Sequence, residues 1–462
     1  MNTGTAVLTR TYKFEQLLSE EGWLSPGFVN IDASGFIVSI SSVGNNADHT
    51  FDGFCLPGLP NLHSHAFQRA MAGLTEISGS GENNFWTWQN VMYEFLGKLD
   101  PEDVEAIGAQ LFMEMLKGGY TAVAEFHYLH HDKDGAHYDN PAEMSDRIIA
   151  AAIETGISLT LLPVLYGYGG FGAKPPLDGQ KRFLHNMDQF GHLLNSLQSG
   201  YSNIEGIELG IALHSLRAVS PEMIDKAVSQ AQQGPIHIHI SEQLREVEQC
   251  VNWSGKRPVE WLLDHSEVGE RWCLLHATHM TESEISAFAK TGAIAGLCPT
   301  TEANLGDGLF PLEQFLNQNG RFGVGSDSNT SVDAAEELRL LEYGQRLIQQ
   351  RRNVGARGKG ESSGSSLFLG ALDGGRQALG QPIGLLAPGK RADFIILDKM
   401  HPVLAGRSGN TILDSWIFTG GRELITDVFV AGRHLVQKGR HINQEQIENR
   451  FRHTISRLMS AE

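Results

Sequence analysis

Short apolar runs recur along the chain, and each is followed by a polar loop and then by a segment with helical periodicity. The runs are nearly continuous stretches of Val, Ile, Leu and Ala, as expected for parallel strands that are buried on both faces. They occupy residues 54–61, 120–126, 159–166, 207–214, 235–240, 271–276, 293–298 and 321–325. Helical periodicity occurs at residues 101–117, 141–155, 221–232, 282–291 and 334–351. This order of strand-then-helix units predicts a (β/α)8 TIM barrel rather than a doubly wound open sheet.

The two ends of the chain follow a different pattern. Short apolar runs separated by Gly and Asp turns occur at residues 28–31, 36–40, 392–397, 428–433 and 434–436. Such runs are typical of β-sheet, and we expect the two ends to pair because strand edges need partners. The sequence therefore predicts an α/β protein with a small β-sandwich domain from residues 1–55 and 384–445, and a barrel from residues 56–383.

Composition excludes several classes of partner. The net charge of −18, without any block of Lys or Arg, repels phosphate backbones and anionic membranes, so we expect no nucleic acid or membrane partner. An anionic small-molecule substrate would need local arginines. The start of the chain lacks an apolar signal segment, and no apolar stretch approaches the roughly twenty residues that span a bilayer. We expect a cytoplasmic protein, with a homodimer as its assembly.

The cysteines do not suggest a metal or redox motif. They are dispersed and form no Cys-x-x-Cys pair, so buried free thiols in a reducing cytosol are expected. The four are Cys55, Cys250, Cys273 and Cys298.

Two histidines one residue apart, His63 and His65, close the first apolar run. Residues i and i+2 of an extended chain point to the same side, so both imidazoles can aim at one point past the strand end. Imidazole is a good ligand for zinc and other divalent transition metals. Taken alone, the pair fits a metal site and a strand cap equally well.

The ends of the later strands favour the metal site. A barrel of this kind carries its chemistry at the carboxyl ends of its strands. Polar residues there are His214 after the fourth strand, His239 and Glu242 after the fifth, His276 after the sixth and Asp327 after the eighth. Chance would supply only one or two, so the set predicts a metal centre. No lysine ends the fourth strand, where a two-metal site would need a carboxylated bridge, and one divalent metal is therefore predicted.

The chemistry of these side chains suggests the ligands. His63, His65 and His239 would supply nitrogen donors, and Asp327 an oxygen donor. His237 shares a strand face with His239 and is the alternative ligand, although His239 lies nearer the strand end.

The remaining strand-end residues suit proton transfer. Glu242 could reach a metal-activated water without binding the metal and could shuttle its proton. His276 could polarise the electrophile or steady the attacking hydroxide. Other polar residues are interpreted without a function: His127, His130 and His131 as loop histidines, and Glu336 and Glu337 as solvated helix charges.

Taken together, these residues resemble the amidohydrolase superfamily. The resemblance covers nearly the whole chain and rests on residues 57–65, the element from His239 to Glu242, His276, residues 325–327 and residues 384–394. It implies the superfamily's mononuclear deaminase branch, which typically carries zinc.

Within that branch the chain resembles the formimidoylglutamate deiminase family. The stretches that carry this resemblance are residues 63–74, 85–88, 124–128, 214–219 and 301–308. It implies hydrolysis of N-formimidoyl-L-glutamate to N-formyl-L-glutamate and ammonia in L-histidine degradation. It also implies that His63, His65, His239 and Asp327 bind zinc, that Glu242 is the proton shuttle with His276 its partner, and that Gln68, Tyr128, His214 and Arg217 contact the substrate.

Arg217 independently indicates an anionic substrate. It lies just past the fourth strand, where a guanidinium can hold a carboxylate with two parallel hydrogen bonds. A purine or pterin offers no such carboxylate, whereas a glutamate derivative offers two. The alternative for Arg217 is a surface ion pair with Glu222 or Asp225. The chain departs from the family pattern at Gln89, where an arginine is expected, and at Asn329, where a histidine is expected.

Two other functions stay open. An aminohydrolase, or deaminase, of a purine, pterin or other cyclic amidine would use the same metal centre. A barrel without catalysis, serving as a binding or scaffold protein, is the second alternative, and the intact ligand and shuttle positions disfavour it.

Overall fold

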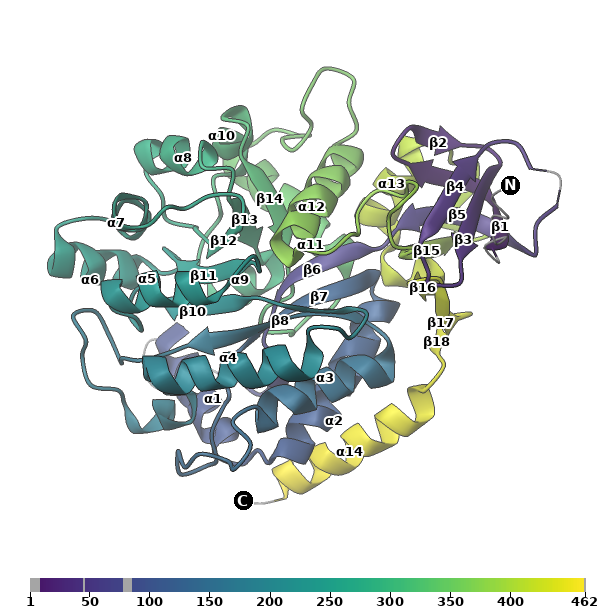
Figure 1. Cartoon of the computed structure of the whole chain (residues 1–462). Helices are drawn as coiled ribbons and strands as arrows, with labels where there is room; N and C mark the ends of the chain where they lie inside the picture. The colour runs from purple at the N-terminus through teal and green to yellow at the C-terminus, as the bar shows by residue number, and fades with distance from the viewer. Residues whose placement is uncertain (1–8, 45, 78–84, 461–462) are drawn as a thin grey trace, which may run out of the picture.

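The computed structural model describes residues 9–44, 46–77 and 85–460. Their strands form two sheets, a parallel one at the centre of the molecule and a smaller one beside it (Figure 1).

Eight parallel strands form the central sheet in chain order. They are β6 (Leu59–Ser64), β7 (Tyr120–His127), β8 (Ser158–Leu165), β10 (Ile211–Ser215), β11 (Ile236–Ile240), β12 (Trp272–His276), β13 (Ile294–Leu297) and β14 (Arg321–Val324), and the short β9 (Ile207–Leu209) pairs with β8. A parallel bridge between Ser64 and Asp327 brings the first and last strands together. The predicted (β/α)8 barrel is therefore confirmed.

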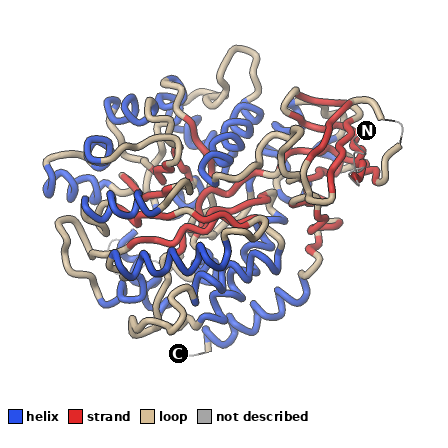
Figure 2. The backbone as a smooth tube through the Cα atoms, viewed as in Figure 1, coloured by secondary structure: helices blue, strands red, loops and turns tan. Residues whose placement is uncertain are grey.

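Helices surround the barrel (Figure 2). They are α1 (Phe85–Leu96), α2 (Pro101–Lys117), α3 (Glu143–Thr155), α4 (Met187–Tyr201), α5 (Pro221–Gln230), α6 (Leu244–Ser254), α7 (Pro258–His265), α8 (Glu282–Ala289), α9 (Pro299–Leu305), α10 (Leu312–Asn317), α11 (Ala334–Gln349) and α12 (Ser363–Leu379). The helix predicted at residues 101–117 coincides with α2. The other four predicted helices begin or end two residues inside the predicted limits.

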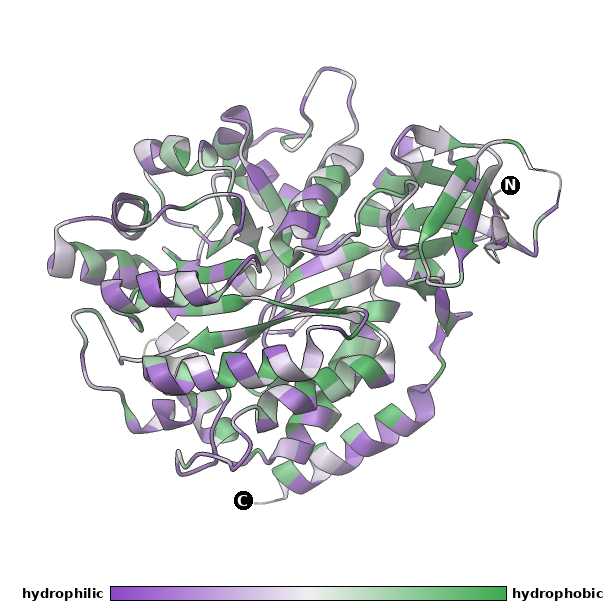
Figure 3. Ribbon diagram, viewed as in Figure 1, coloured by the Kyte–Doolittle hydropathy of each residue, from purple (hydrophilic) through white to green (hydrophobic). Residues whose placement is uncertain are grey.

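Burial explains the continuous apolar runs. Every residue of β7, β8, β11 and β12 is buried, because side chains on one face fill the barrel and those on the other meet the helices. Figure 3 shows green, hydrophobic strands beneath helices that carry purple, hydrophilic residues on their outer faces.

Strands from both ends of the chain form the second sheet. They are β1 (Thr9–Ser19), β2 (Gly22–Leu24), β3 (Gly27–Asp32), β4 (Ile37–Ser41), β5 (His49–Pro57), β15 (Phe394–Asp398), β16 (Ile425–Val430), β17 (Arg433–Gln437) and β18 (Arg440–His441). The N-terminal β5 pairs with the C-terminal β15, as predicted. The sheet has its own core around Phe14, Phe394 and Phe429, which fits the predicted small β-sandwich.

The first predicted barrel strand, residues 54–61, is divided between the two sheets. Residues up to Pro57 belong to β5, and the barrel strand β6 begins at Leu59. Gly58 allows the change of sheet, since a Cβ at this position would lie 2.1 Å from Cγ2 of Thr121. The predicted strand at residues 207–214 likewise divides into β9 and β10. Hydropathy does not show the break at Gly58, because the chain is buried on both sides of it.

The last helix packs against the barrel. After α13 (Asn410–Ser415), the C-terminal α14 (Gln444–Met459) runs beside α2, where Nζ of Lys117 donates to Oε1 of Gln444 at 3.2 Å (Figure 1). None of the helices in the described part of the chain has the length and apolar character needed to cross a membrane.

Candidate active site

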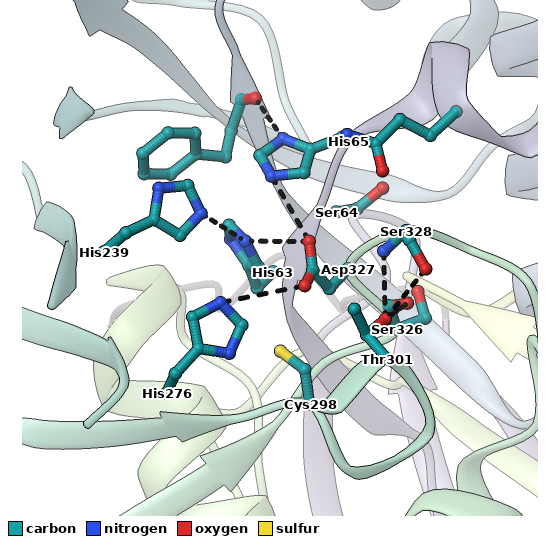
Figure 4. A network of polar contacts seen from close by, with 12 residues as sticks. His63, Ser64, His65, His239, His276, Cys298, Thr301, Ser326, Asp327 and Ser328 are labelled. Atoms are coloured by element: carbon teal, nitrogen blue, oxygen red, sulfur yellow. Dashed lines mark hydrogen bonds and ion pairs between the residues drawn. The ribbon is translucent and has the colours of Figure 1, made fainter. Parts of the chain in front are cut away.

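Four side chains converge at the carboxyl ends of the barrel strands (Figure 4). His63, His65, His239 and Asp327 are buried, and each offers one ligand atom within 4.8 Å of the others. Oδ1 of Asp327 lies 3.3 Å from Nε2 of both His63 and His65. Nε2 of His239 lies 3.1 Å from Nε2 of His63. The structure thus brings together the four residues that the sequence predicts as ligands.

Hydrogen bonds behind the rings orient two of the imidazoles. Nδ1 of His65 donates to the carbonyl of Phe126 at 2.9 Å, and Nδ1 of His239 donates to the carbonyl of His214 at 2.8 Å. Because a carbonyl can only accept, each Nδ1 carries the proton and each Nε2 presents a lone pair to the cluster. Lone pairs and a carboxylate that face one another in a buried space need a cation. The donor set therefore fits a divalent metal.

Burial also sets the protonation states that metal binding needs. It lowers the pKa of His63 to about 3 and holds the pKa of His239 well below its usual value. Burial alone would raise the pKa of Asp327, but the neighbouring imidazoles, His63 first, hold it below its usual range. Neutral imidazoles and an ionised carboxylate are the forms that bind a metal ion.

The same residues close the barrel. The backbone N–H of His65 donates to the carbonyl of Asp327 at 3.0 Å, and the N–H of Asp327 donates to the carbonyl of His63 at 2.9 Å. Asp327 has φ of +46°, a conformation that non-glycine residues adopt at a cost and often at functional sites. This backbone aims its carboxylate at the histidines.

Asn329 locks this closure in place. It is fully buried, and its Nδ2 donates to the carbonyls of Asp327 at 2.8 Å and His65 at 3.1 Å. Its Oδ1 accepts from Oγ of Ser326 at 2.6 Å. Asn329, which stands where the family pattern has a histidine, therefore connects the first and last strands and does not line the pocket.

Glu242 and His276 lie on the pocket side of the cluster. Nε2 of His276 is 3.9 Å from Oε1 of Glu242 and 3.7 Å from Oδ2 of Asp327. Burial raises the pKa of Glu242 to about 7. Burial would lower the pKa of His276, but the carboxylates of Glu242 and Glu302 raise it to about 10. This pair can hold a proton near neutral pH beside the cluster.

Two buried carboxylates that the sequence reasoning missed support this pair. Glu246 accepts the backbone N–H of Glu242 at 3.1 Å, and Glu302 lies 3.3 Å from Nδ1 of His276. Each stands in the first turn or two of the helix that follows a barrel strand. A search extended from the strand ends into these helices would have found them.

A second group near the cluster is less suited to a metal. His276, Cys298 and Asp327 also offer ligand atoms within 4.8 Å of one another. Burial raises the pKa of the Cys298 thiol well above its usual value, so no thiolate forms near neutral pH. Like the other three cysteines, Cys298 is buried and unpaired, as the sequence predicts.

A pocket opens beside the cluster, and the four residues predicted to contact substrate line it together with Glu242. They are Gln68 in the short helix η1 (Ala66–Met71), Tyr128, His214 and Arg217. Nε2 of Gln68 donates to the Tyr128 hydroxyl at 2.9 Å.

Arg217 does not form the surface ion pair that was its alternative. It makes no ion pair with Glu222 or Asp225, and the carboxylate of Glu222 accepts from Ser220 instead. The guanidinium carbon lies 5.5 Å from the Trp86 ring, and the buried Nε has no hydrogen-bond partner. The side chain is free to bind an anion in the pocket.

Three other sequence interpretations have clear outcomes. Nε2 of His237 lies 2.8 Å from the carbonyl of Ala378, so this ring points away from the candidate ligands. Glu337 is not a solvated charge: it is fully buried and accepts from the N–H of Thr300 at 3.0 Å. His130 and His131 lie in the loop after β7, as predicted, and are buried against His185, whereas His127 is the last residue of β7.

Much of the pocket wall is aromatic or apolar and was not predicted from the sequence. These lining residues are Trp88, Met92, Tyr93, Tyr166, Phe183 and Leu305, with Gln89 beside them. Trp88 and Leu305 lie in stretches that carry the family resemblance. Aromatic residues in a barrel protein are usually core residues, so nothing in the type or spacing of the others marked them as pocket residues.

Comparison with known proteins places the chain in a family. The amidohydrolase family profile matches residues 54–435. A formimidoylglutamate deiminase from Pseudomonas aeruginosa is 49% identical over 447 residues, which are 96% of this chain and 98% of that protein. An 8-oxoguanine deaminase from the same organism is 28% identical over 75% of each chain.

A solved structure agrees. An amidohydrolase from Brucella melitensis is 45% identical, covers 97% of this chain and 100% of its own, and superposes with a TM-score of 0.94. The chain belongs to the amidohydrolase family. The sequence resemblance to that superfamily, and to formimidoylglutamate deiminases within it, is confirmed.

Proposed function

We propose that this chain hydrolyses N-formimidoyl-L-glutamate to N-formyl-L-glutamate and ammonia, a step of L-histidine degradation. The similarity to a formimidoylglutamate deiminase over nearly the whole length supports this reaction. The structural observation that carries it is Arg217, which lines the same pocket as Glu242, forms no ion pair with a described carboxylate and has a buried Nε without a hydrogen-bond partner. A substrate with a carboxylate near its hydrolysed group fits this arrangement.

Zinc is the proposed cofactor, as a single ion held by His63, His65, His239 and Asp327. Three imidazole nitrogens and one carboxylate oxygen are a donor set that zinc commonly takes in hydrolases. Bound there, zinc would supply Lewis-acid activation of water and substrate.

Glu242 is the proposed proton carrier. It takes a proton from the attacking water and passes it to the nitrogen that leaves. The water oxygen bonds to the formimidoyl carbon as this first proton reaches the nitrogen. Glu242 then carries the remaining hydroxyl proton to the same nitrogen, the carbon–nitrogen bond breaks, the formyl carbonyl forms, and ammonia departs. A carboxyl group with a pKa of about 7 can both accept and donate near neutral pH. His276, protonated because of its neighbouring carboxylates, steadies the attacking oxygen by donating from Nε2.

A cyclic amidine is the second candidate substrate. The similarity to an 8-oxoguanine deaminase favours it, whereas Arg217 favours an acyclic carboxylate. Ammonia release should be measured on zinc-loaded protein with N-formimidoyl-L-glutamate, N-formimidoyl-L-aspartate, guanine and adenosine. We expect N-formimidoyl-L-glutamate to give the highest kcat/KM. A higher kcat/KM for a purine would overturn the proposal.

The proposed enzyme acts in the cytoplasm as a homodimer. Four buried, unpaired cysteines suit a reducing compartment. The exposed apolar side chains of Leu347 and Ile348 on α11 offer a surface to a second copy. Cell fractionation and light scattering test these two statements.

A further inference from the structure

A second cavity adjoins the active-site pocket. It shares Gln89, Tyr166 and Arg217 with that pocket and extends past Trp86 to Arg245. We call this second cavity the outer chamber. The inner pocket measures about 50 Å³, room for a few water molecules, whereas the outer chamber measures about 530 Å³. A substrate that places its reacting group beside Glu242 must therefore extend its remaining atoms toward the outer chamber.

The outer chamber is positively charged in an acidic protein. Lys174, Arg217 and Arg245 line it, and none of its described lining residues is Asp or Glu. The whole chain carries a net charge of −18, so a wall whose described residues include three cations and no acid departs from the rest of the sequence. Such a wall attracts anions and raises their local concentration.

Two of these cations lie near one indole ring. The guanidinium carbon of Arg245 lies 4.5 Å from the Trp86 ring, and that of Arg217 lies 5.5 Å from it. Cation–π contacts hold both guanidinium groups in place. An anion between or beside the two would offset their mutual repulsion.

The position of Arg245 on its helix is unfavourable without an anion. It is the second residue of α6, where the helix dipole disfavours a positive charge. It is exposed and makes no ion pair with any described carboxylate. A negatively charged ligand at this helix end would interact favourably with both the helix and the side chain.

We propose that the outer chamber is a subsite for the substrate's second carboxylate and that Arg245 binds it. This inference rests on the proposed function. Arg217, which lines both cavities, binds the carboxylate next to the formimidoyl group, and Arg245 binds the side-chain carboxylate. Arg245 thus makes the enzyme select dicarboxylates. It supplies a positive charge that an arginine at position 89 would supply and that Gln89 does not.

The test compares two substrates that differ only at the side-chain carboxylate. N-formimidoyl-L-norvaline has a methyl group where N-formimidoyl-L-glutamate has that carboxylate. We expect Arg245→Met to raise KM for the glutamate derivative about tenfold, the effect of losing one charge-assisted hydrogen bond, without changing KM for the norvaline derivative. Arg245→Lys should recover part of the loss. The control is Arg433→Met, which removes an exposed arginine on β17 and should change neither KM.

A binding measurement separates this inference from the proposed function. Calorimetry with glutarate, which has both carboxylates and no reacting group, should show about tenfold weaker binding to Arg245→Met than to the wild type. If the wild type turns over the glutamate derivative and Arg245→Met has unchanged KM and glutarate affinity, the subsite is wrong and the function stands. If the wild type releases no ammonia but Arg245→Met still weakens glutarate binding, the function is wrong and the subsite stands.

Discussion

At the scale of single residues, Asp327 shows how tightly the candidate centre is specified. Its carboxylate faces His63 and His65 at 3.3 Å, while its backbone pairs with the first strand. The side chain must be short, ionised and compatible with φ of +46°. Aspartate meets these three requirements, since it tolerates the left-handed region better than most residues.

Glu242 tests the proposed proton transfer. Glu242→Gln keeps the shape of the side chain but cannot accept a proton, so kcat should fall by about 100-fold or more. The metal content, measured by atomic absorption, should stay near that of the wild type because Glu242 is not among the candidate ligands. Retained turnover would show that another group carries the proton.

Arg217 tests the proposed substrate anchor. Arg217→Met removes a guanidinium that faces the pocket, and losing such a charge pair costs about 2–5 kcal/mol. KM for N-formimidoyl-L-glutamate should therefore rise about 30-fold or more, with metal content unchanged. If the same loss of activity is accompanied by loss of bound metal, Arg217 has a structural role instead.

The candidate site could be predicted where residue type and strand position sufficed. His63, His239, His276 and Asp327 are residue types with ligand or acid–base chemistry, and the barrel rule places strand ends together. Glu246 and Glu302 could not be found this way, because they stand in the helices that follow the strands and support Glu242 and His276 through hydrogen bonds that the strand-end rule does not show. The roles of all these residues in metal and substrate binding stay predictions.

At the scale of elements, the barrel closes where β6 meets the loop after β14. We call this junction the seam, and it combines backbone pairing with side-chain hydrogen bonds. Asn61 extends the seam below the histidines: its Nδ2 donates to Oγ of Ser326 at 2.7 Å, and its Oδ1 accepts the N–H of Ser326 at 3.1 Å. Asn329 continues it above them. Buried amides thus replace part of the regular strand ladder at the place where the candidate ligands stand.

Asn329→Ala tests the importance of this seam. The change removes two hydrogen bonds to the carbonyls of Asp327 and His65 and one from Ser326, and each lost hydrogen bond costs about 0.5–1.5 kcal/mol. The melting temperature should fall, and metal affinity should weaken by about tenfold because the supporting hydrogen bonds orient the ligands. Asn319→Ala is the matched control, since Asn329 and Asn319 have similar φ values of +58° and +61° but Asn319 is exposed. Asn319→Ala should have the same cost of placing alanine at a positive φ and should leave metal affinity unchanged. If both variants weaken metal affinity equally, the seam has no role in orienting the ligands.

The barrel strands and five of its helices could be predicted to within a few residues, but the other helices and the changes of sheet could not. An apolar run shows that a strand is buried and does not show against which neighbour. The division at Gly58 depends on Thr121, which lies far away in the sequence. Such long-range contacts are absent from a local hydropathy pattern.

At the scale of the whole molecule, a few buried carboxyl groups make stability depend on pH. Glu125 is fully buried in β7, where its Oε1 accepts the N–H of Ala66 at 2.6 Å. Burial raises its pKa to about 8, above the ordinary value of 4.5. The stability that this group contributes is therefore complete below about pH 4.5 and is lost as pH rises through about 8.

Glu125→Gln should remove this dependence. Gln cannot ionise and can still accept the N–H of Ala66. Between about pH 5 and 8 the variant should gain stability relative to the wild type, by up to about 1.4 kcal/mol per pH unit. Thermal melts of both proteins across this range measure the difference. A constant difference in melting temperature would show that Glu125 keeps the same protonation state in the folded and unfolded chains.

The passage from β5 to β6 has a consequence for how this architecture can be rearranged. The N–H of Gly58 donates to the carbonyl of Asp393 in the small domain, and the next N–H, of Leu59, donates to the carbonyl of Gly119 in the barrel. His63 follows only a few residues later. A chimaera that takes its small domain from a relative would therefore replace the anchor of the strand that bears the histidine pair. The two domains are separate in architecture, but we expect that neither can be exchanged between relatives without the other.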